Sequence, residues 1–177
     1  MNDDELVEQI KLGNDSAAEE LIQRYYASIL RYCKWHCSSL EEAEDLTQEC
    51  FLKLFRNLPQ YGVRERGSPR KNFKAYLYTI AKHLCIDENR KMKVYSLEDE
   101  EGIVSGRNEI LQIEHREDIR RLLRILSSEQ REAIILRYGE QLSYQEIANV
   151  MGCNMRTAQS RVRKALKVMR KEQGYER

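Results

Sequence analysis

Apolar side chains recur at helical spacing over most of this chain. Between residues 16 and 33, Leu21, Tyr25 and Ile29 lie four residues apart and therefore share one side of a helix. The same period runs through residues 41–58, 73–91, 110–126 and 129–138, and residues 4–12 read as a further short helix. The pattern predicts an all-α fold.

Two interruptions divide the helical pattern. Residues 60–72, QYGVRERGSPRKN, follow the helix-ending Pro59 and are polar, basic and rich in glycine, so we expect a loop there. Residues 96–108, SLEDEEGIVSGRN, lose the period and gain acidic residues and glycine, which is typical of a flexible linker. We therefore predict two small helical domains, residues 1–95 and 113–177, joined by a flexible acidic linker over residues 96–112.

The segment SYQEIANVMGCNMRTAQSRVRKAL, residues 143–166, predicts two short helices around a tight turn. Ser143 and Glu146 have the spacing of a capping box, as do Ser127 and Gln130 before the preceding helix. Gly152 suits a left-handed helix end, and Asn154 can cap the next helix. The apolar positions of that next helix are Met155, Ala158, Val162, Ala165, Leu166 and Met169. Such a helix-turn-helix places its second helix in the DNA major groove.

The other face of this second helix is basic, and residues 147–171 contain no acidic side chain. Arginine and glutamine can make paired hydrogen bonds to guanine and adenine edges, whereas serine, threonine and lysine suit phosphates. A basic face exposed only to solvent is the alternative interpretation. The candidate DNA-binding residues are Arg156, Thr157, Gln159, Ser160, Arg161, Arg163, Lys164 and Lys167.

Charge is segregated along the chain, although the net charge is only +1. Residues 1–58 carry six basic and twelve acidic side chains (net −6), and residues 59–95 carry nine and three (net +6). Residues 96–118 carry two and eight (net −6), and residues 119–177 carry thirteen and six (net +7). The two basic blocks predict contact with a polyanion at two places, while the acidic blocks remain for other partners.

Composition favours a cytoplasmic protein. The longest apolar runs, such as AIIL at 133–136, are far too short to span a bilayer, so no membrane insertion is expected. The acidic start MNDDELVEQ lacks the apolar core of a secretory signal. The five cysteines have no disulfide-scaffold spacing and fit reduced thiols inside a cell.

Two stretches in order resemble one protein family. The run LSSEQREAIILRYGEQLSYQEIANVMGCNMRTAQSRVRKAL (126–166) resembles region 4 of bacterial sigma factors of the extracytoplasmic-function (ECF) group, in the sigma-70 superfamily. AEDLTQECFLKLFRNL (43–58) and FKAYLYTIAKHLCIDENRK (73–91) resemble region 2 of the same group. The resemblance implies a specificity subunit of RNA polymerase that is not an enzyme and needs no cofactor. The implied partners are the β′ clamp helices and β flap of core polymerase, promoter DNA and an anti-sigma factor.

The resemblance also implies roles for particular residues. The helix at 43–58 would dock on the β′ clamp helices through Asp45, Gln48, Glu49 and Lys53. Without the resemblance, this face would read as an ordinary solvated helix surface. The segment 61–91 would open the −10 element and capture a flipped base, and the helix-turn-helix would bind the −35 element. The −10 candidates are Lys74, Tyr78, Lys82, His83, Asp87, Arg90 and Lys91, with Arg64, Arg66, Arg70 and Lys71 in the loop; Phe73 is expected in the core.

Three departures from the family pattern bear on promoter choice. The loop between Tyr61 and Phe73 is longer than in typical members. His83 stands where many members have asparagine, which allows a different −10 preference or a pH-sensitive contact. RTAQSRV replaces the commoner VGTVKSRL-like pattern, so that Gln159 takes the place of a basic residue and leaves the −35 sequence open.

Two other interpretations stay open. A stand-alone LuxR-like helix-turn-helix regulator would share only the C-terminal half and would leave residues 41–91 unexplained. A metal-sensing or redox protein could use CKWHC, in which Cys33, His36 and Cys37 would share one helical side. No fourth ligand is visible nearby in the sequence, and buried thiols commonly behave as small apolar side chains.

Overall fold

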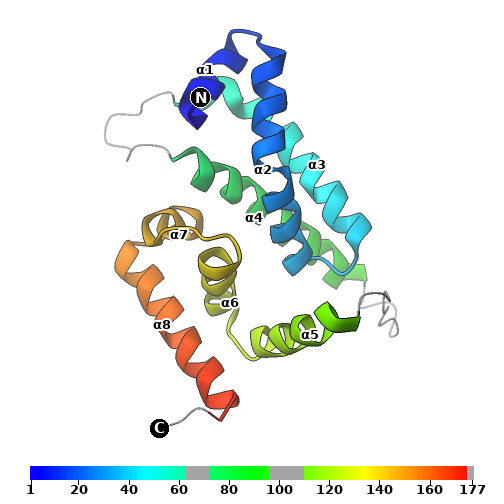
Figure 1. Cartoon of the computed structure of the whole chain (residues 1–177), viewed down its shortest axis with the longest axis vertical. Coiled ribbons are helices and arrows are strands. Elements are labelled where there is room, and N and C mark those ends of the chain that lie inside the picture. Colours follow the sequence, from blue (N-terminus) through cyan, green and yellow to red (C-terminus); the bar gives the residue numbers. More distant parts are fainter. Residues whose placement is uncertain (63–71, 96–109, 175–177) are drawn as a thin grey trace. The chain divides into compact units, whose positions relative to one another are not determined.

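The computed structural model describes residues 1–62, 72–95 and 110–174, and the regular secondary structure within these ranges is helical (Figure 1). The chain divides into two compact units, Met1–Glu100 (unit 1) and Glu101–Arg177 (unit 2). The predicted fold class, two small all-α domains, is thereby confirmed. Each helix in the described part of the chain is too short or too polar to cross a bilayer.

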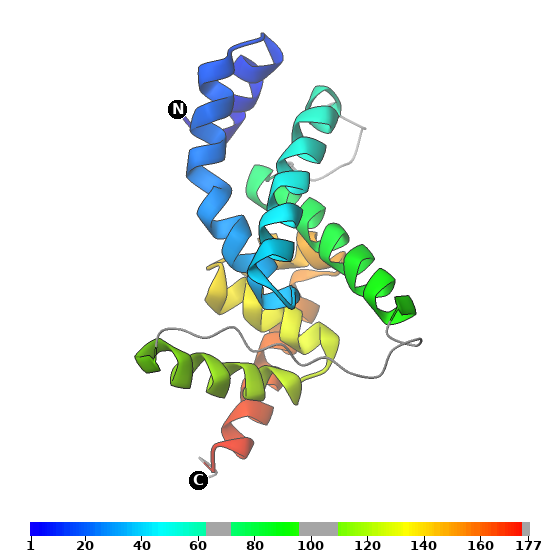
Figure 2. The same cartoon turned by 90° about the vertical axis from the view of Figure 1, so that its right-hand side faces the viewer.

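Unit 1 is a bundle of four helices: α1 (Asp3–Lys11), α2 (Asp15–His36), α3 (Leu40–Asn57) and α4 (Phe73–Tyr95). The helices α2, α3 and α4 pack against one another, and α1 lies against α2 (Figure 2). A short 3-10 turn, Leu58–Gln60, contains Pro59 and ends α3 where the sequence predicts. The bundle places one outward face of α3 and one of α4 in solvent.

Side-chain caps start the helices of unit 1. Asn2 and Glu5 form a capping box, with both hydrogen bonds at 2.9 Å. Asn14 accepts a hydrogen bond from the Ala17 amide at 3.3 Å, and Ser39 accepts one from the Glu42 amide. These caps satisfy amides that the first turn of a helix leaves without partners.

Aromatic residues fill much of the core of unit 1. The Phe73 ring is buried, as predicted, and its centroid lies 5.7 Å from those of both Tyr25 and Tyr61. Tyr61 belongs to the segment expected as a polar loop, yet its side chain is buried. Deeper in the bundle, Tyr32 of α2 meets Tyr78 of α4 edge to face with ring centroids 5.5 Å apart.

Unit 2 contains α5 (Ile110–Arg124), α6 (Ser128–Ile134), α7 (Tyr144–Met151) and α8 (Met155–Glu172). Both α6 and α7 pack against α8. The helix expected over residues 129–138 ends instead in a π-helical turn, Ile135–Gly139. The chain then reverses, so that Leu142 is buried and its carbonyl accepts a hydrogen bond from Arg137 at 2.9 Å. This arginine fixes the turn that leads into α7.

Candidate nucleic-acid and protein interfaces

The turn between α7 and α8 has the geometry that the sequence predicts. Ser143 and Glu146 form a capping box at the start of α7. Gly152 ends that helix in the left-handed region, at φ 63° and ψ 37°, and Asn154 accepts the Thr157 amide at 2.8 Å to start α8. A Cβ added to Gly152 would meet no atom within 4 Å, so backbone conformation rather than space favours glycine here. The turn therefore fixes the direction of α8.

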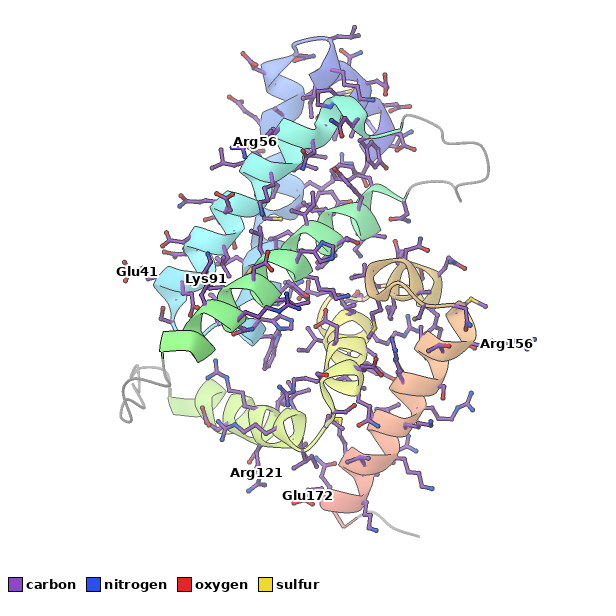
Figure 3. The ribbon with its side chains drawn as sticks, turned by 180° about the vertical axis from the view of Figure 1, so that it is seen from behind. Glu41, Arg56, Lys91, Arg121, Arg156 and Glu172 are labelled. Atoms are coloured by element: carbon purple, nitrogen blue, oxygen red, sulfur yellow. The ribbon has the colours of Figure 1, made fainter. Side chains whose placement is uncertain are left out.

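Helix α8 separates a buried small-residue face from a basic one. Ala158, Val162 and Ala165 are buried, while Leu166 and Met169 are half-buried. Met155 was expected in this apolar stripe, but its side chain is 43 % exposed because it lies in the first turn of the helix. On the basic face Arg156, Arg163, Lys164 and Lys167 are exposed, and Thr157, Gln159, Ser160 and Arg161 are half-buried. Figure 3 shows Arg156 pointing away from the ribbon.

One arginine of this face already has an acidic partner. The Arg161 guanidinium donates to Glu129 Oε1 of α6 at 2.8 Å. The Arg161 side chain is 20 % exposed and that of Glu129 is 64 % exposed. Glu129 was not a candidate in the sequence, because it lies 32 residues away and no local spacing connects the two. If Arg161 contacts DNA, the Glu129 carboxylate must either move away or remain bound to the same guanidinium beside the DNA.

The −10 candidates on α4 do not share one face. At 100° per residue, His83, Asp87 and Arg90 fall on one side of α4, and all three are exposed. Lys91 is also exposed and pairs with Glu88 at 3.4 Å, while Lys82 is half-buried at the edge of the face. Lys74 is half-buried on the opposite side. The loop candidates Arg64, Arg66, Arg70 and Lys71 lie outside the described residues.

Tyr78 is not available to stack on a base. Its side chain is fully buried against Tyr32, because position 78 falls on the inner side of α4. Tyr76, not Tyr78, faces the side of α4 where a base could stack. It lies seven residues before His83, on the same exposed side of the helix, and is only half-buried. Its ring packs against Tyr61 at 4.9 Å, and burial raises the pKa of its hydroxyl, which keeps the phenol protonated. The i, i+7 spacing from His83 was the sequence signal for Tyr76.

The outer face of α3 carries the four candidates for protein contact. Asp45 and Gln48 are exposed, and Glu49 and Lys53 are half-buried. Figure 3 labels Glu41 and Arg56, which lie near the two ends of this helix. At the centre of the same face, seven residues after Asp45, the Leu52 side chain is 58 % exposed. Sequence reasoning missed Leu52, although its i+7 spacing from Asp45 could have identified it.

The CKWHC segment ends α2. Cys33 is buried, and His36 and Cys37 are half-buried. Within the described residues, no group of three histidine, cysteine or acidic side chains is arranged to hold a metal ion. The geometry therefore gives no support to the interpretation of CKWHC as a metal site.

Family models match both units in order: Sigma-70 region 2 over residues 21–93 and Sigma-70, region 4 over residues 116–169. Together with the bundle and the helix-turn-helix, these matches define a two-domain protein of the sigma-70 class. SigD of Mycobacterium tuberculosis, an ECF RNA polymerase sigma factor, is 33 % identical over 93 % of this chain and 82 % of its own length. The chain belongs to the ECF RNA polymerase sigma factors.

Two further relatives extend over nearly the whole chain. SigW of Bacillus subtilis, also an ECF sigma factor, is 26 % identical over 94 % of each chain. The sigma factor RpoE of Bartonella quintana, solved in complex with the anti-sigma factor NepR, aligns with a TM-score of 0.68 and 25 % identity. That alignment covers 90 % of this chain and 98 % of RpoE. Because region 2 is matched as well as region 4, a stand-alone LuxR-like regulator is not favoured.

Proposed function

We propose that this chain binds core RNA polymerase in the cytoplasm and directs it to promoters whose −35 and −10 elements it recognises. The observation that carries the proposal is the presence, in one chain and in family order, of a region 2 bundle and a region 4 helix-turn-helix. Catalysis belongs to the polymerase, and this chain supplies binding surfaces only. It acts without a cofactor.

The outer face of α3 anchors the chain to the β′ clamp helices through Asp45, Gln48, Glu49 and Lys53. Leu52 joins this set, since an exposed apolar residue surrounded by charged ones is typical of the centre of a protein interface. The carboxylates add complementarity to a basic partner surface and favour rapid association. Unit 2 additionally contacts the β flap.

The basic face of α8 holds the −35 duplex. Exposed lysines and arginines supply phosphate contacts, whereas Arg156 and Gln159 near the start of the helix have the position and chemistry to reach base edges. The exposed side of α4 then engages the −10 element, with His83, Asp87, Arg90 and Lys91 beside Tyr76 and with Lys82 at the edge. The phenol ring of Tyr76 offers a surface on which an unstacked base can lie.

An anti-sigma factor is a further proposed partner. The relative RpoE forms a complex with NepR, and this chain aligns with RpoE over both units. The anti-sigma factor would cover the same exposed faces that bind polymerase and DNA. Occlusion of either the α3 or the α8 face by such a protein suffices to prevent initiation.

Transcription with purified core polymerase tests the proposal directly. The full chain is expected to bind core polymerase and to give transcripts from specific start sites on genomic DNA. Absence of core binding, together with tight binding of duplex DNA by the chain alone, would support a stand-alone regulator instead. Sequencing the transcripts also gives the two promoter elements.

A charge-reversal substitution distinguishes the polymerase-binding surface on α3 from the DNA-binding surface on α8. Asp45→Lys should weaken binding to core polymerase and leave the affinity of the chain for −35 duplex unchanged. The matched control is Glu19→Lys, which makes the same change at an exposed position of α2 and not on the proposed contact face of α3. Equal loss in both variants would show that net charge, and not this face, governs binding.

A further inference from the structure

The last residue of α1 reaches the buried aromatic residues next to Tyr76. The Lys11 ammonium donates to the Tyr61 carbonyl at 2.7 Å, across 50 residues of sequence. It also pairs with Glu8 of its own helix at 2.9 Å. The Lys11 side chain is only 22 % exposed, whereas that of Glu8 is 68 % exposed. The contact with Tyr61 is the better shielded of the two, and hydrogen bonds from a charged donor are among the stronger ones.

Lys11 completes the fixing of the Tyr61 backbone. The Tyr61 amide donates to the Leu58 carbonyl at 3.0 Å, so the short 3-10 turn holds one side of this residue. Lys11 holds the other side, where Gly62 follows in the left-handed region at φ 83°. A Cβ added at Gly62 would lie 3.8 Å from the Lys11 nitrogen, so the ammonium sits beside the bend itself. Both peptide groups of Tyr61 are therefore bonded, and the direction in which its ring leaves the backbone is set.

The Tyr61 ring in turn packs against Tyr76. The Tyr61 side chain is buried, and its ring centroid lies 4.9 Å from that of Tyr76 and 5.7 Å from that of Phe73. Tyr76 is half-buried, so part of its ring stays accessible. Because an aromatic side chain has only a few staggered rotamers, a neighbouring ring at this distance selects among them. The orientation of the Tyr76 ring thus depends on the position of Tyr61.

Helix α1 is itself anchored at its other end. Asp3, in its first turn, pairs with Arg24 of α2 at 2.7 Å and accepts a hydrogen bond from the Tyr25 hydroxyl. The Arg24 guanidinium also donates to the Met1 carbonyl at 2.8 Å. Lys11 is therefore carried by a helix that α2 holds in place, which is what a residue needs to position another one.

We propose that Lys11 is a positioning residue for the −10 site: it fixes Tyr61, and Tyr61 sets the Tyr76 ring on which an unstacked base lies. This inference rests on the −10 role of Tyr76 in the proposed function. Lys11 acts through these two tyrosines and makes no contact with the DNA itself. The hydrogen bond spans 50 residues, so no local spacing in the sequence could have revealed it.

Binding of the holoenzyme to single-stranded DNA tests the proposal. The probe is a labelled oligonucleotide carrying the −10 element mapped from the transcripts of this protein, and fluorescence anisotropy gives the dissociation constant. Lys11→Met keeps the aliphatic stem but removes the donor, and should raise the dissociation constant about 3- to 10-fold, less than the loss of up to about 150-fold for a whole stacking contact. Lys11→Arg keeps a cationic donor and should stay within about 2-fold of the wild-type value. No loss in Lys11→Met, or no rescue by Lys11→Arg, would overturn the positioning role.

Two measurements separate positioning from a direct phosphate contact. The dependence of affinity on salt concentration should have the same slope in Lys11→Met as in the wild type. A slope smaller by about 0.7 would show that Lys11 itself neutralises a phosphate, and would refute the proposal. In the Tyr76→Leu background, Lys11→Met should change the dissociation constant by less than about 2-fold, because the ring through which Lys11 acts is gone. A full additional loss in that background would refute the route through Tyr76.

Lys34→Met is the matched control, because it removes a lysine from the last turn of α2 with the same loss of charge. A loss of affinity equal to that of Lys11→Met would show that net charge causes the effect, and would overturn the proposal.

Amide hydrogen exchange of the free chain tests the Lys11 contact without polymerase or DNA. The Tyr61 amide should exchange at least about 3-fold faster in Lys11→Met than in the wild type, because its local structure opens more readily. Unchanged exchange would overturn the fixing of Tyr61. Faster exchange in Lys11→Met, combined with no −10 binding by the wild-type holoenzyme, would instead overturn the proposed function and leave only the contact between Lys11 and Tyr61 standing.

Discussion

Replacing Glu129 with alanine is expected to strengthen binding to −35 DNA, whereas replacing Arg161 with alanine weakens it. The two side chains form an ion pair of 2.8 Å between α6 and α8. Because the Glu129 side chain is 64 % exposed, this pair contributes only about 0–1 kcal/mol to stability. A paired contact from an arginine to a base is worth about 1–3 kcal/mol, so the DNA contact outweighs the ion pair.

The magnitudes follow from these two contributions. Arg161→Ala should raise the dissociation constant about 5- to 150-fold if the arginine reads a base. Glu129→Ala should lower the dissociation constant by up to about 5-fold, because Arg161 then binds DNA without first breaking its ion pair with the Glu129 carboxylate. The assay is fluorescence anisotropy of a labelled −35 duplex with the full chain, at two or more fixed salt concentrations, since phosphate contacts make affinity salt-dependent.

Glu172→Ala is the matched control, because it removes another exposed carboxylate from the far end of α8. It should leave the affinity for DNA within about 2-fold of the wild-type value, as expected for a distant and screened charge. If Glu129→Ala weakens binding as strongly as Arg161→Ala, then Glu129 positions the arginine and does not compete with DNA. An unchanged sequence preference in Arg161→Ala would refute base reading by this residue.

Three further substitutions test the other surfaces and the turn. Leu52→Glu should weaken binding to core polymerase at least about 10-fold without changing the melting temperature. Leu12→Glu, at the 80 % exposed leucine that directly follows α1, should not weaken it; equal effects would contradict a specific contact. Gly152→Ala should lower the free energy of unfolding of unit 2 by about 1–2 kcal/mol in thermal melts, because alanine is disfavoured at φ 63°. Gly152→Asn should lower it less, since asparagine tolerates the left-handed conformation. An unchanged free energy of unfolding in Gly152→Ala would argue against the left-handed turn. Tyr76→Leu should weaken binding of the holoenzyme to single-stranded −10 DNA by about 1–3 kcal/mol while the fold is retained. Tyr78→Leu should instead lower the stability of unit 1. Unchanged DNA binding in Tyr76→Leu would exclude base stacking by this ring.

Local signals in the sequence were sufficient for the elements and for the turn of the helix-turn-helix. The structure contains each of the predicted helix caps, and each joins groups only three residues apart. They are the capping boxes of Ser127 with Gln130 and of Ser143 with Glu146, and the N-cap Asn154. Capping depends on the identity and spacing of neighbours, so a sequence is enough to find it. The apolar period likewise identified the packed face of α8.

The errors arose where tertiary packing decides orientation. A polar aromatic residue in a basic segment favours a base-stacking role for Tyr78, but its position on α4 turns the side chain into the core, while Tyr76 faces outward. Leu52 was overlooked because an apolar residue near an apolar stripe is readily assigned to the core. The ion pair of Glu129 with Arg161 joins different helices, and no local spacing predicts such a pair.

The structure of unit 1 explains how one small bundle can carry two binding functions. The inner sides of α3 and α4 meet in a shared core, where the Cys50 thiol approaches the Leu77 carbonyl at 3.9 Å. Burial raises the pKa of Cys50, so this thiol remains neutral within the apolar layer. Because the inner sides of both helices are buried in this core, we expect polymerase contacts and DNA contacts to come from their outward faces. Substitutions on one outward face should therefore leave the other function intact, whereas changes in the shared core affect both through stability.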